Sequence, residues 1–466
     1  MIRFIVIGIT DNPQPFFSPE VMEIIRQGKV FSGGKRHHEI VASLLPEGAE
    51  WIDITVPLDA VFKRYESLTP NPIPAEAPAR PLVACKARTR SLSLGGEGSG
   101  YTQRQKSHPQ NTQGNKLSTP LSSERGVGGE ALIVFASGDP LFFGFANTIK
   151  RKMPEAAVTV FPTFNSLQML AHRLVMPYHD MRIVSLTGRP WPEFDRVLIE
   201  RTEKIGVLTD KEHAPAAIAQ RMLEYNYSGY TMHVGEHLGN PQLEKVTTLT
   251  LEEAARREFS MPNCVILCGK TAEHTRLFGI PDSEFALLDG REKMISKMPI
   301  RLLTLQALDL PHRHVLWDIG SCTGSVSIEA RLQFPHLHVE AFEIRPECEA
   351  IIRENARRFG APGIDIHIGD FLTTPLHYRE GAGVGLPDAV FIGGHGGRLK
   401  EIMAKVLTVL TDDGVMVMNS VKAPKVMTDS HQLWDEACAE LGLQQEPPLH
   451  IQLNDHHPIT ILKCKR

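Results

Sequence analysis

The chain begins with an unbroken apolar run, which indicates the kind of sheet that the N-terminal region forms. Residues 3–8 read RFIVIG, and continuous apolar runs are typical of strands buried on both faces of a parallel sheet. Ser18-Pro19-Glu20 then supplies a capping hydroxyl, a proline for the first turn and an acid for the helix dipole. A helix is therefore predicted from here to Gly28, followed by a second strand at 29–31. Together these elements predict a βαβ unit with a right-handed crossover.

The hydrophobic pattern stops between about residue 75 and residue 129. Residues 85–129 are rich in Ser, Gly, Gln, Thr and Lys, with almost no aromatic or β-branched side chains. Such a composition cannot bury enough apolar surface to offset the ordering of the chain. We therefore expect a disordered insertion at about 85–129. A binding tail is the alternative, because the segment also contains several Arg and Lys residues.

Order resumes with a predicted strand at 131–139, and strands and helices then alternate to the C-terminus. Helices are predicted at 166–175, with Ser166 as the cap, and at 210–227, and MPNCVILCG (261–269) is predicted as the last strand of the first half. Five further strand candidates alternate with helices, as in a parallel sheet. The sequence thus predicts a domain at 1–268, a linker at 269–282 and a second domain at 283–466.

Composition narrows the class of protein. The chain has 466 residues, 42% of them hydrophobic, and a net charge of −4, so nothing suggests the basic surface that nucleic-acid binding requires. No apolar run approaches the roughly 20 residues of a membrane-spanning helix, so no membrane association is expected. The seven cysteines are scattered and form no C-x-x-C pair, which disfavours a disulfide framework and a zinc site and fits the reducing cytoplasm. We expect no metal site.

Three strand ends in the C-terminal half carry acids in the positions that a nucleotide site uses. The strand at 315–317 ends at Asp318, and Gly320 and Gly324 flank the turn that follows it. Glycines there let the backbone approach a ligand at the N-terminus of the next helix. Glu343 ends the second strand and suits ribose hydroxyls, and Asp370, after the third strand, could accept from an adenine amine. A fourth strand leads into IGGHGG (392–397), where a substrate would lie.

The ligand of this site is predicted to be S-adenosylmethionine rather than a dinucleotide. The turn D-x-G-x-x-x-G lacks the third glycine of the dinucleotide fingerprint. The D/N-P-P-Y type of loop that methylates exocyclic amines of nucleic acids is absent, so a carbon or small-molecule acceptor fits better. Upstream, VFASGDPLFFG (134–144) is a second and different signal of a methyltransferase. A methyltransferase for another acceptor and a non-catalytic nucleotide-binding protein are the alternatives.

Motifs in both halves match one family in order. The C-terminal half contains DIGSCTGSVSIEA, FIGGHGG and RENARRFG, and the N-terminal half contains GGKRHHE, ASGDPLFFG, SLTGRP, LTD and VGEHLGNP. On these motifs the chain resembles the precorrin-6Y C(5,15)-methyltransferase (decarboxylating) family of cobalamin biosynthesis. The resemblance implies an α/β fold, in which a two-lobed tetrapyrrole methylase domain precedes a Rossmann-like class I methyltransferase domain.

The same resemblance implies an activity and its partners. The substrate would be a contracted tetrapyrrole, a precorrin or cobalt-precorrin that carries many carboxylates. The N-terminal domain would methylate ring position 5, and the C-terminal domain would methylate position 15 with loss of an acetate carboxyl as carbon dioxide. Each domain would bind one S-adenosylmethionine as methyl donor, and the family suggests a homo-oligomer, which the cysteine usage places in the cytoplasm.

The motif matches assign candidate site residues, which fall into three groups. Those implied to bind S-adenosylmethionine are Gly8, Gly138, Asp139, Pro140, Asn165 and Ser166 in the first site and Asp318, Gly320, Gly324, Glu343 and Asp370 in the second. A polyanionic macrocycle calls for basic side chains and free backbone N–H groups, so the predicted substrate-binding residues are Lys35, Arg36, Gly393, Gly394 and Gly396. The candidates for catalytic groups are His395, Lys297 and Arg189.

Four positions depart from the family pattern. Thr10 lies in an opening loop, GITDNP, where the family more often has G-I-G-P, and Thr187 replaces the histidine of S-L-H-G-R. Cys322 replaces the middle glycine of D-I-G-x-G-T-G, which is tolerated only if the backbone there does not need a positive φ. Pro299 interrupts a T-K-x-E-V-R segment and leaves Lys297 and Arg301 as the substrate contacts expected from it.

Overall fold

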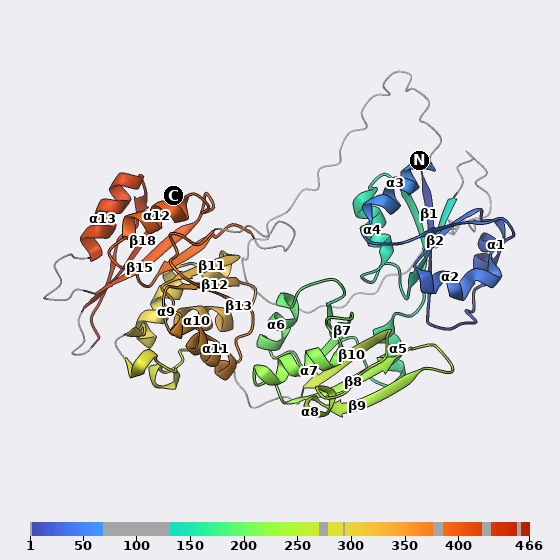
Figure 1. The fold of residues 1–466 in the computed structure, drawn as a ribbon, viewed down its shortest axis with the longest axis horizontal. Coiled ribbons are helices and arrows are strands. Elements are labelled where there is room, and N and C mark those ends of the chain that lie inside the picture. The colour runs from blue at the N-terminus through green and yellow to red at the C-terminus, as the bar shows by residue number, and fades with distance from the viewer. Residues whose placement is uncertain are drawn as a thin grey trace, which may run out of the picture. The chain divides into compact units, whose positions relative to one another are not determined.

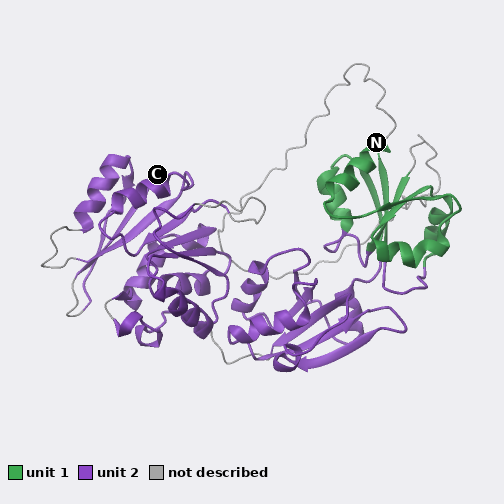
Figure 2. Ribbon diagram, viewed as in Figure 1, with its two compact units in different colours: residues 1–7, 17–136, 145–161 green, residues 8–16, 137–144, 162–466 purple. Residues whose placement is uncertain are grey.

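The computed structural model describes residues 2–68, 131–269, 278–291, 294–375, 385–421, 430–453 and 458–466 (Figure 1). The predicted insertion at 85–129 and most of the predicted linker at 269–282 lie outside these residues. The chain divides into two compact units (Figure 2). Unit 1 comprises residues 1–7, 17–136 and 145–161, and unit 2 comprises residues 8–16, 137–144 and 162–466.

Unit 1 contains a five-stranded sheet with the strand order β3-β2-β4-β1-β5. The predicted first strand and helix are confirmed, and Ser18 caps the helix by accepting a hydrogen bond from the Val21 N–H at 3.3 Å. Strand β4 lies between β1 and β2, so the predicted βαβ unit spans an intervening strand. The strands are β1 (Arg3–Ile9), β2 (Val30–Gly33), β3 (Glu50–Asp53), β4 (Ala131–Ser137) and β5 (Ala157–Phe161), and the α-helices are α1 (Pro19–Gln27), α2 (Lys35–Val41), α3 (Asp59–Ser67) and α4 (Phe145–Lys152).

The first sheet of unit 2 is mixed and has the order β6-β7-β10-β8-β9. Strands β6 and β7 are parallel, whereas β10 runs antiparallel to both β7 and β8. The strands are β6 (Arg182–Ser185), β7 (Lys204–Leu208), β8 (Tyr230–Glu236), β9 (Lys245–Thr250) and β10 (Asn263–Gly269), and the α-helices are α5 (Ser166–Arg173), α6 (Pro192–Ile199), α7 (Pro215–Glu224) and α8 (Leu251–Ala254).

One predicted helix cap and one predicted helix start in this region are wrong. Asn165, not Ser166, is the cap of α5, because its side-chain oxygen accepts from the Gln168 N–H at 2.9 Å while Gln168 bonds back to the Asn165 N–H. Helix α7 begins at Pro215 rather than at Asp210. The Asp210 carboxylate instead accepts hydrogen bonds from backbone N–H groups of the turn that precedes α7, so Asp210 lies outside the helix.

The second sheet of unit 2 has the order β13-β12-β11-β14-β15-β18-β16, with β17 paired to β18. Five of its strands are parallel, as predicted, whereas β18 runs antiparallel to β15 and was not predicted. The strands are β11 (Val315–Ile319), β12 (His338–Glu343), β13 (Ile364–Ile368), β14 (Ala389–Ile392), β15 (Val415–Val421), β16 (Gln444–Gln445), β17 (Leu449–Ile451) and β18 (Ile459–Lys465), and the α-helices are α9 (Met298–Ala307), α10 (Ser325–Gln333), α11 (Glu347–Phe359), α12 (Leu399–Leu407) and α13 (Ser430–Leu441).

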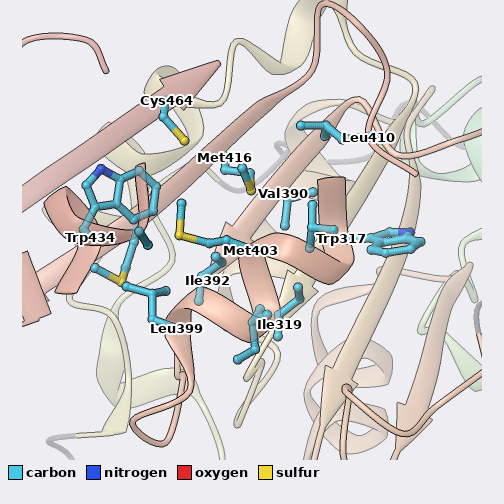
Figure 3. Packing of buried hydrophobic residues seen from close by; sticks show 14 of the residues in the cluster. Trp317, Ile319, Val390, Ile392, Leu399, Met403, Leu410, Met416, Trp434 and Cys464 are labelled. Atoms are coloured by element: carbon cyan, nitrogen blue, oxygen red, sulfur yellow. The ribbon is translucent and has the colours of Figure 1, made fainter. Parts of the chain in front are cut away.

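A large apolar core supports one face of this sheet. Trp434 of α13 and Met403 of α12 are fully buried and pack with the side chains of β14 and β15, among them Val390 and Met416 (Figure 3). The core fixes the strands whose carboxyl ends carry the predicted acids. No helix in the described part of the chain is both long enough and apolar enough to cross a membrane.

Candidate functional site

The carboxyl ends of β11 and β14 bring two glycine segments into contact. The N–H groups of Gly320 and Ser321 both donate to the Phe342 carbonyl of β12, at 2.8 and 3.1 Å, which holds the turn after β11. Gly320 has φ +78°, and a Cβ on it would lie only 2.6 Å from the Gly394 nitrogen. The Gly393 N–H donates to the Ile319 carbonyl at 2.8 Å. Predicted cofactor and substrate residues therefore meet at one edge of the sheet, and we call this group the second cluster.

Asp318 is the most deeply buried acid of the second cluster, with 1% of its surface exposed. Its Oδ2 accepts from the Ser327 N–H at 3.2 Å and from the Ser327 hydroxyl at 2.5 Å, whereas Oδ1 has no hydrogen-bond partner. The buried hydroxyls of Ser321 and Thr323 in the same turn also lack a partner. Burial raises the pKa of Asp318 to about 6. Unsatisfied buried polar atoms are costly and rare, so three of them in one turn indicate a place for a polar ligand.

The raised pKa of Asp318 predicts opposite effects of Asp318→Asn on stability and binding. Because the folded-state pKa of Asp318 lies above its ordinary value of 3.8, protonation of Asp318 stabilises the folded state. This stabilisation is fully present below pH 3.8 and is lost as the pH rises through about 6. The amide should therefore stabilise the protein at pH 7 by up to about 3 kcal/mol and weaken binding of S-adenosylhomocysteine. Urea unfolding at pH 4 and pH 7, with calorimetric titration, measures both effects. Asp412→Asn, at an exposed side chain, should change neither.

Glu343 lies at the end of β12 with 2% of its surface exposed. Its Oε2 accepts from the Cys322 N–H at 2.9 Å, and Arg345 donates to both carboxylate oxygens from its guanidinium and to Oε1 from its backbone N–H. Ile344, between these two residues, is 55% exposed although it is apolar. Sequence analysis missed Ile344 and Arg345. Their signal was an apolar and a basic residue immediately after the strand-end acid.

Cys322 has a left-handed backbone, with φ +50°, and is 5% exposed. The condition under which the sequence analysis tolerated a cysteine there is therefore not met. The side chain packs in a small apolar cluster with Leu288, Cys348 and Ile352. This packing offsets part of the conformational cost of a side chain at positive φ, which is about 1–2 kcal/mol.

Two substitutions of Cys322 should separate backbone strain from packing. Cys322→Gly removes the strain and also the buried thiol, two effects of about 1 kcal/mol each with opposite signs, so stability should change by less than about 1 kcal/mol. Cys322→Val places a β-branched side chain at positive φ and should destabilise the protein by more than about 2 kcal/mol. Chemical unfolding measures both. Equal losses for the two variants would show that packing of the thiol, not the backbone, decides.

Four further predicted residues of the C-terminal half also lie in segments that follow strands of this sheet. Asp370 accepts from Arg398 at 2.9 Å, an ion pair that lowers the pKa of the carboxyl. Gly324 has φ +71° and precedes α10. His395 accepts from the Gly397 N–H at Nδ1 and faces the Ser430 hydroxyl at 3.3 Å through Nε2, and burial lowers its pKa. Gly396, at φ +56°, has open space where a side chain would be.

The segment around Pro299 differs from the expectation. Met298 and Pro299 begin α9, where a proline in the first turn is favourable, so the segment is a helix start rather than an interruption. Lys297 lies 3.6 Å from the Asp282 carboxylate. Arg301 is fully buried, pairs with Glu329 at 3.2 Å and donates to the Ser296 carbonyl, so it is not available as a substrate contact.

Another group of loops in unit 2 brings together the residues predicted for the N-terminal S-adenosylmethionine site, and we call this group the first cluster. The Gly138 N–H donates to the Ile9 carbonyl at 2.8 Å. A Cβ on Gly8 would overlap the Gly138 carbonyl oxygen and lie 2.9 Å from the Thr163 nitrogen, and a Cβ on Gly138 would lie 2.9 Å from the Asn165 Cα. The three loops after β1, β4 and β5 therefore touch through backbone, which only glycine at positions 8 and 138 permits.

Side chains of the first cluster stabilise these turns. Asp139 Oδ1 accepts from the Leu141 N–H at 2.8 Å, and Pro140 is buried. The Ser166 side chain lies beside the buried Cys264 thiol. Two large apolar side chains that the sequence analysis did not single out, Phe143 and Phe164, are 47% and 57% exposed.

The SLTGRP and LTD motifs form a joint structure beside this cluster. The Gly188 N–H donates to the Asp210 carboxylate at 2.8 Å, and the Thr187 hydroxyl donates to the Thr209 carbonyl at 3.1 Å. Thr187, which stands where the family pattern has a histidine, thus has a hydrogen-bond partner in the backbone. Arg189 bonds to Ser185 and places its guanidinium 5.3 Å from the centre of the Phe143 ring.

The predicted substrate residues of the N-terminal region lie in unit 1. Lys35 and Arg36 open α2, directly after the glycines that end β2. Lys35 is exposed, and Arg36 is half-buried. His37, next in the helix, accepts from the Gly34 N–H at 3.2 Å, and burial lowers its pKa to about 4. An imidazole held neutral by burial favours a structural role for His37.

Two glycine-built clusters at strand ends, one after β1, β4 and β5 and one after β11 and β14, are typical of S-adenosylmethionine-dependent methyltransferases. Residues 16–255 match the family model described as tetrapyrrole (corrin/porphyrin) methylases, and residues 289–449 match the precorrin methyltransferase domain. The chain is 31% identical over 326 residues to the precorrin-6Y C(5,15)-methyltransferase [decarboxylating] of Sinorhizobium sp, covering 69% of this chain and 76% of that protein. The chain belongs to this family of precorrin-6Y C(5,15)-methyltransferases (decarboxylating).

Two other relatives are named for a single step. The cobalt-precorrin-6B C(15)-methyltransferase (decarboxylating) of Salmonella typhi is 32% identical over 186 residues, which cover 38% of this chain and 93% of that protein. The cobalt-precorrin-7 C(5)-methyltransferase of Salmonella typhimurium is 27% identical over 138 residues, which cover 30% of this chain and 66% of that protein.

Proposed function

We propose that this enzyme transfers methyl groups from S-adenosylmethionine to ring positions 5 and 15 of a precorrin-6-type tetrapyrrole and decarboxylates one of its acetate side chains, in corrin ring biosynthesis. The observation that carries the proposal is the presence of two unlike glycine-built clusters on one chain. The second lies within the match to the precorrin methyltransferase domain, and the first lies within the match to the tetrapyrrole methylases except for its opening loop at Gly8. Residues 1–268 would serve position 5 and residues 283–466 position 15, each with one S-adenosylmethionine.

The residues of the second cluster fit this ligand. Asp318 Oδ1 and the hydroxyls of Ser321 and Thr323 are buried and unpartnered, and a methionine ammonium and carboxylate would give them partners. The exposed Ile344 supplies an apolar surface for adenine, and Asp370 an acceptor for its amine. Glu343 would accept from the ribose hydroxyls.

Arg345 controls access to Glu343. An ionised carboxylate has about four acceptor sites, and the Cys322 N–H and three groups of Arg345 donate to Glu343. The ribose hydroxyls can therefore bind only if the Arg345 guanidinium releases at least one oxygen. Because that guanidinium is 36% exposed, its release needs no change in the core.

The first cluster fits the same ligand through its backbone. Neighbouring main chain occupies the space where side chains of Gly8 and Gly138 would be. The turns that carry Asp139, Pro140 and Asn165 therefore present little side-chain bulk at these glycines. Backbone groups of such turns can approach a ligand closely. Ser166 would contribute its backbone N–H, because its side chain lies beside the buried Cys264 thiol.

Bound S-adenosylmethionine supplies a methyl group that is already activated for transfer. The protein's main contribution is then orientation of the acceptor, which is worth up to about 7–11 kcal/mol. Lys35 and Arg36 would hold carboxylates of the macrocycle in the reaction at position 5. Arg189, held beside Phe143, would fix a further carboxylate there. In the reaction at position 15 the Gly396 N–H would bind the substrate, and Gly393 and Gly394, whose N–H groups donate to the Ile319 carbonyl, would line its place without side-chain bulk. His395 would face the departing carboxyl, and Lys297 would balance its charge.

The names of two relatives suggest the order of the steps. They attach the C(15) reaction to a precorrin-6B and the C(5) reaction to a precorrin-7. We therefore propose that position 15 is methylated before position 5. A cytoplasmic homo-oligomer remains part of the proposal.

Mass spectrometry of the product tests the function. The purified protein would be incubated without oxygen with S-adenosylmethionine and a reduced precorrin-6 substrate, with and without cobalt. A gain of two methyl groups with loss of one carbon dioxide is expected. One methyl group with carbon dioxide retained would disprove the assignment of position 15, and an unchanged substrate in both forms would mean another acceptor.

A further inference from the structure

An aspartate–histidine pair joins the opening loop of the first cluster to the loop after β8. His237 Nδ1 lies 2.9 Å from Asp11 Oδ2, and the two side chains are 19% and 10% exposed. His237 has φ +49°, a left-handed conformation that is uncommon outside glycine. Its N–H donates to the Pro262 carbonyl at 2.8 Å, and its carbonyl accepts from the Asn240 N–H at 2.9 Å. The imidazole is thus fixed through its ring and through both of its backbone polar groups.

Three consecutive residues tie this imidazole to the predicted cofactor turn. The Ile9 carbonyl accepts from the Gly138 N–H, and Thr10 abuts Gly239, where a Cβ would lie 3.1 Å from the threonine side chain. Asp11 then holds His237. The segment GITDNP, which departs from the family pattern, therefore has contacts of its own, and these place His237 within the first cluster.

The geometry points to His237, oriented by Asp11, as the group that accepts the proton released when ring position 5 is methylated. This inference rests on the proposed function, in which the first cluster serves position 5. A ring carbon between two pyrroles bears one hydrogen. The new carbon–methyl bond uses a π electron pair of the ring, and the donor sulfur keeps the pair of the bond that breaks. The C–H pair then returns to the ring, and the proton goes to Nε2 of His237 and on to solvent.

The carboxylate determines which ring nitrogen can act. Asp11 as a carboxylate only accepts hydrogen bonds, so Nδ1 carries the proton and Nε2 is left as the basic atom. Asp210 and His213 form a similar pair at 3.0 Å, but the His213 side chain is only 6% exposed, and its ring packs against Trp191 with 4.6 Å between centroids. Of these two imidazoles, the one of His237 is the more exposed, at 19% against 6%, and is therefore better placed to meet a substrate.

The variant His237→Asn separates a proton acceptor from a loop tie. Its amide can still donate to Asp11 but cannot take up a proton. Formation of the twice-methylated product should fall about 100-fold or more, the lower end for general-base catalysis, while the once-methylated, decarboxylated product accumulates. Melting temperature and calorimetric affinity for S-adenosylhomocysteine should stay unchanged. His233→Asn, at an imidazole whose partner is the Thr248 hydroxyl, is the matched control and should behave as the wild type.

Two further measurements keep the test decisive. Nitrogen NMR of the free protein should show His237 protonated at Nδ1, and Asp11→Asn should change that tautomer. Added imidazole should restore part of the rate to His237→Ala. An unimpaired rate in His237→Asn, or a rate loss matched by lost S-adenosylhomocysteine affinity, would overturn the inference and leave a loop tie. Absence of the twice-methylated product in the wild type would instead refute the proposed function.

Discussion

Replacing Gly8 with alanine should stop methylation at ring position 5 while the reaction at position 15 continues. The added Cβ would overlap the Gly138 carbonyl oxygen and lie 2.9 Å from the Thr163 nitrogen, and both obstacles are backbone. Backbone of three packed loops cannot move aside as a flexible side chain can, so the loops must separate. We expect a destabilisation of about 2 kcal/mol or more and accumulation of the once-methylated, decarboxylated product, measured by thermal unfolding and mass spectrometry.

Gly229→Ala is the matched control for this substitution. Gly229 also lies in unit 2, but a Cβ there meets no atom within 4 Å, and its φ is not positive. The control should make the twice-methylated product at the wild-type rate. If Gly8→Ala also made this product at the wild-type rate, the contact between the loops after β1 and β4 would not be needed for the reaction at position 5.

Sequence patterns predicted the strand-end residues of the second cluster because their signals are local. A buried strand, a glycine turn and a helix start can be recognised within about 15 residues, and parallel strands place their carboxyl ends at one edge. Asp318 and Glu343 follow from this logic, and both are buried at that edge. Their roles toward S-adenosylmethionine remain predictions.

Contacts between distant segments could not be predicted in this way. Nothing near Asp11 in the sequence indicates His237, and the antiparallel pairing of β18 with β15 joins positions as far apart as Val415 and Lys465. Arg301 was expected at the substrate from its place in the T-K-x-E-V-R segment of the family, yet it is buried in an ion pair with Glu329 of α10. Charge alone does not distinguish a substrate contact from a buried ion pair, because the partner is known only once the helices are packed.

The fit of Cys322 shows the same limit in a single residue. Sequence reasoning identified the relevant variable, the sign of φ, but predicted tolerance only for negative φ. The backbone is left-handed, and the packing of the thiol against Leu288, Cys348 and Ile352 is the compensating feature. That packing joins three segments far apart in the sequence, so no local pattern contains it.

Gly320→Ala should abolish the reaction at position 15 and, if position 15 comes first, yield no methylated product. Its φ of +78° disfavours any side chain, and the new Cβ would lie 2.6 Å from the Gly394 nitrogen. We expect a loss of about 3 kcal/mol or more in the unfolding transition of this sheet and loss of one S-adenosylhomocysteine site by calorimetry. Gly385→Ala, whose Cβ would approach no atom closer than 4.0 Å, should be neutral.

Mixing the Gly320→Ala and Gly8→Ala variants tests whether each lesion is confined to one reaction. The Gly8→Ala variant would supply the once-methylated, decarboxylated intermediate, and the intact first cluster of the Gly320→Ala variant would methylate it at position 5. The mixture should therefore form the twice-methylated product that neither variant forms alone. Failure of the mixture, with both variants folded, would show that the two reactions require both intact clusters on one chain. Recovery would establish that the two clusters work in sequence on a diffusible intermediate.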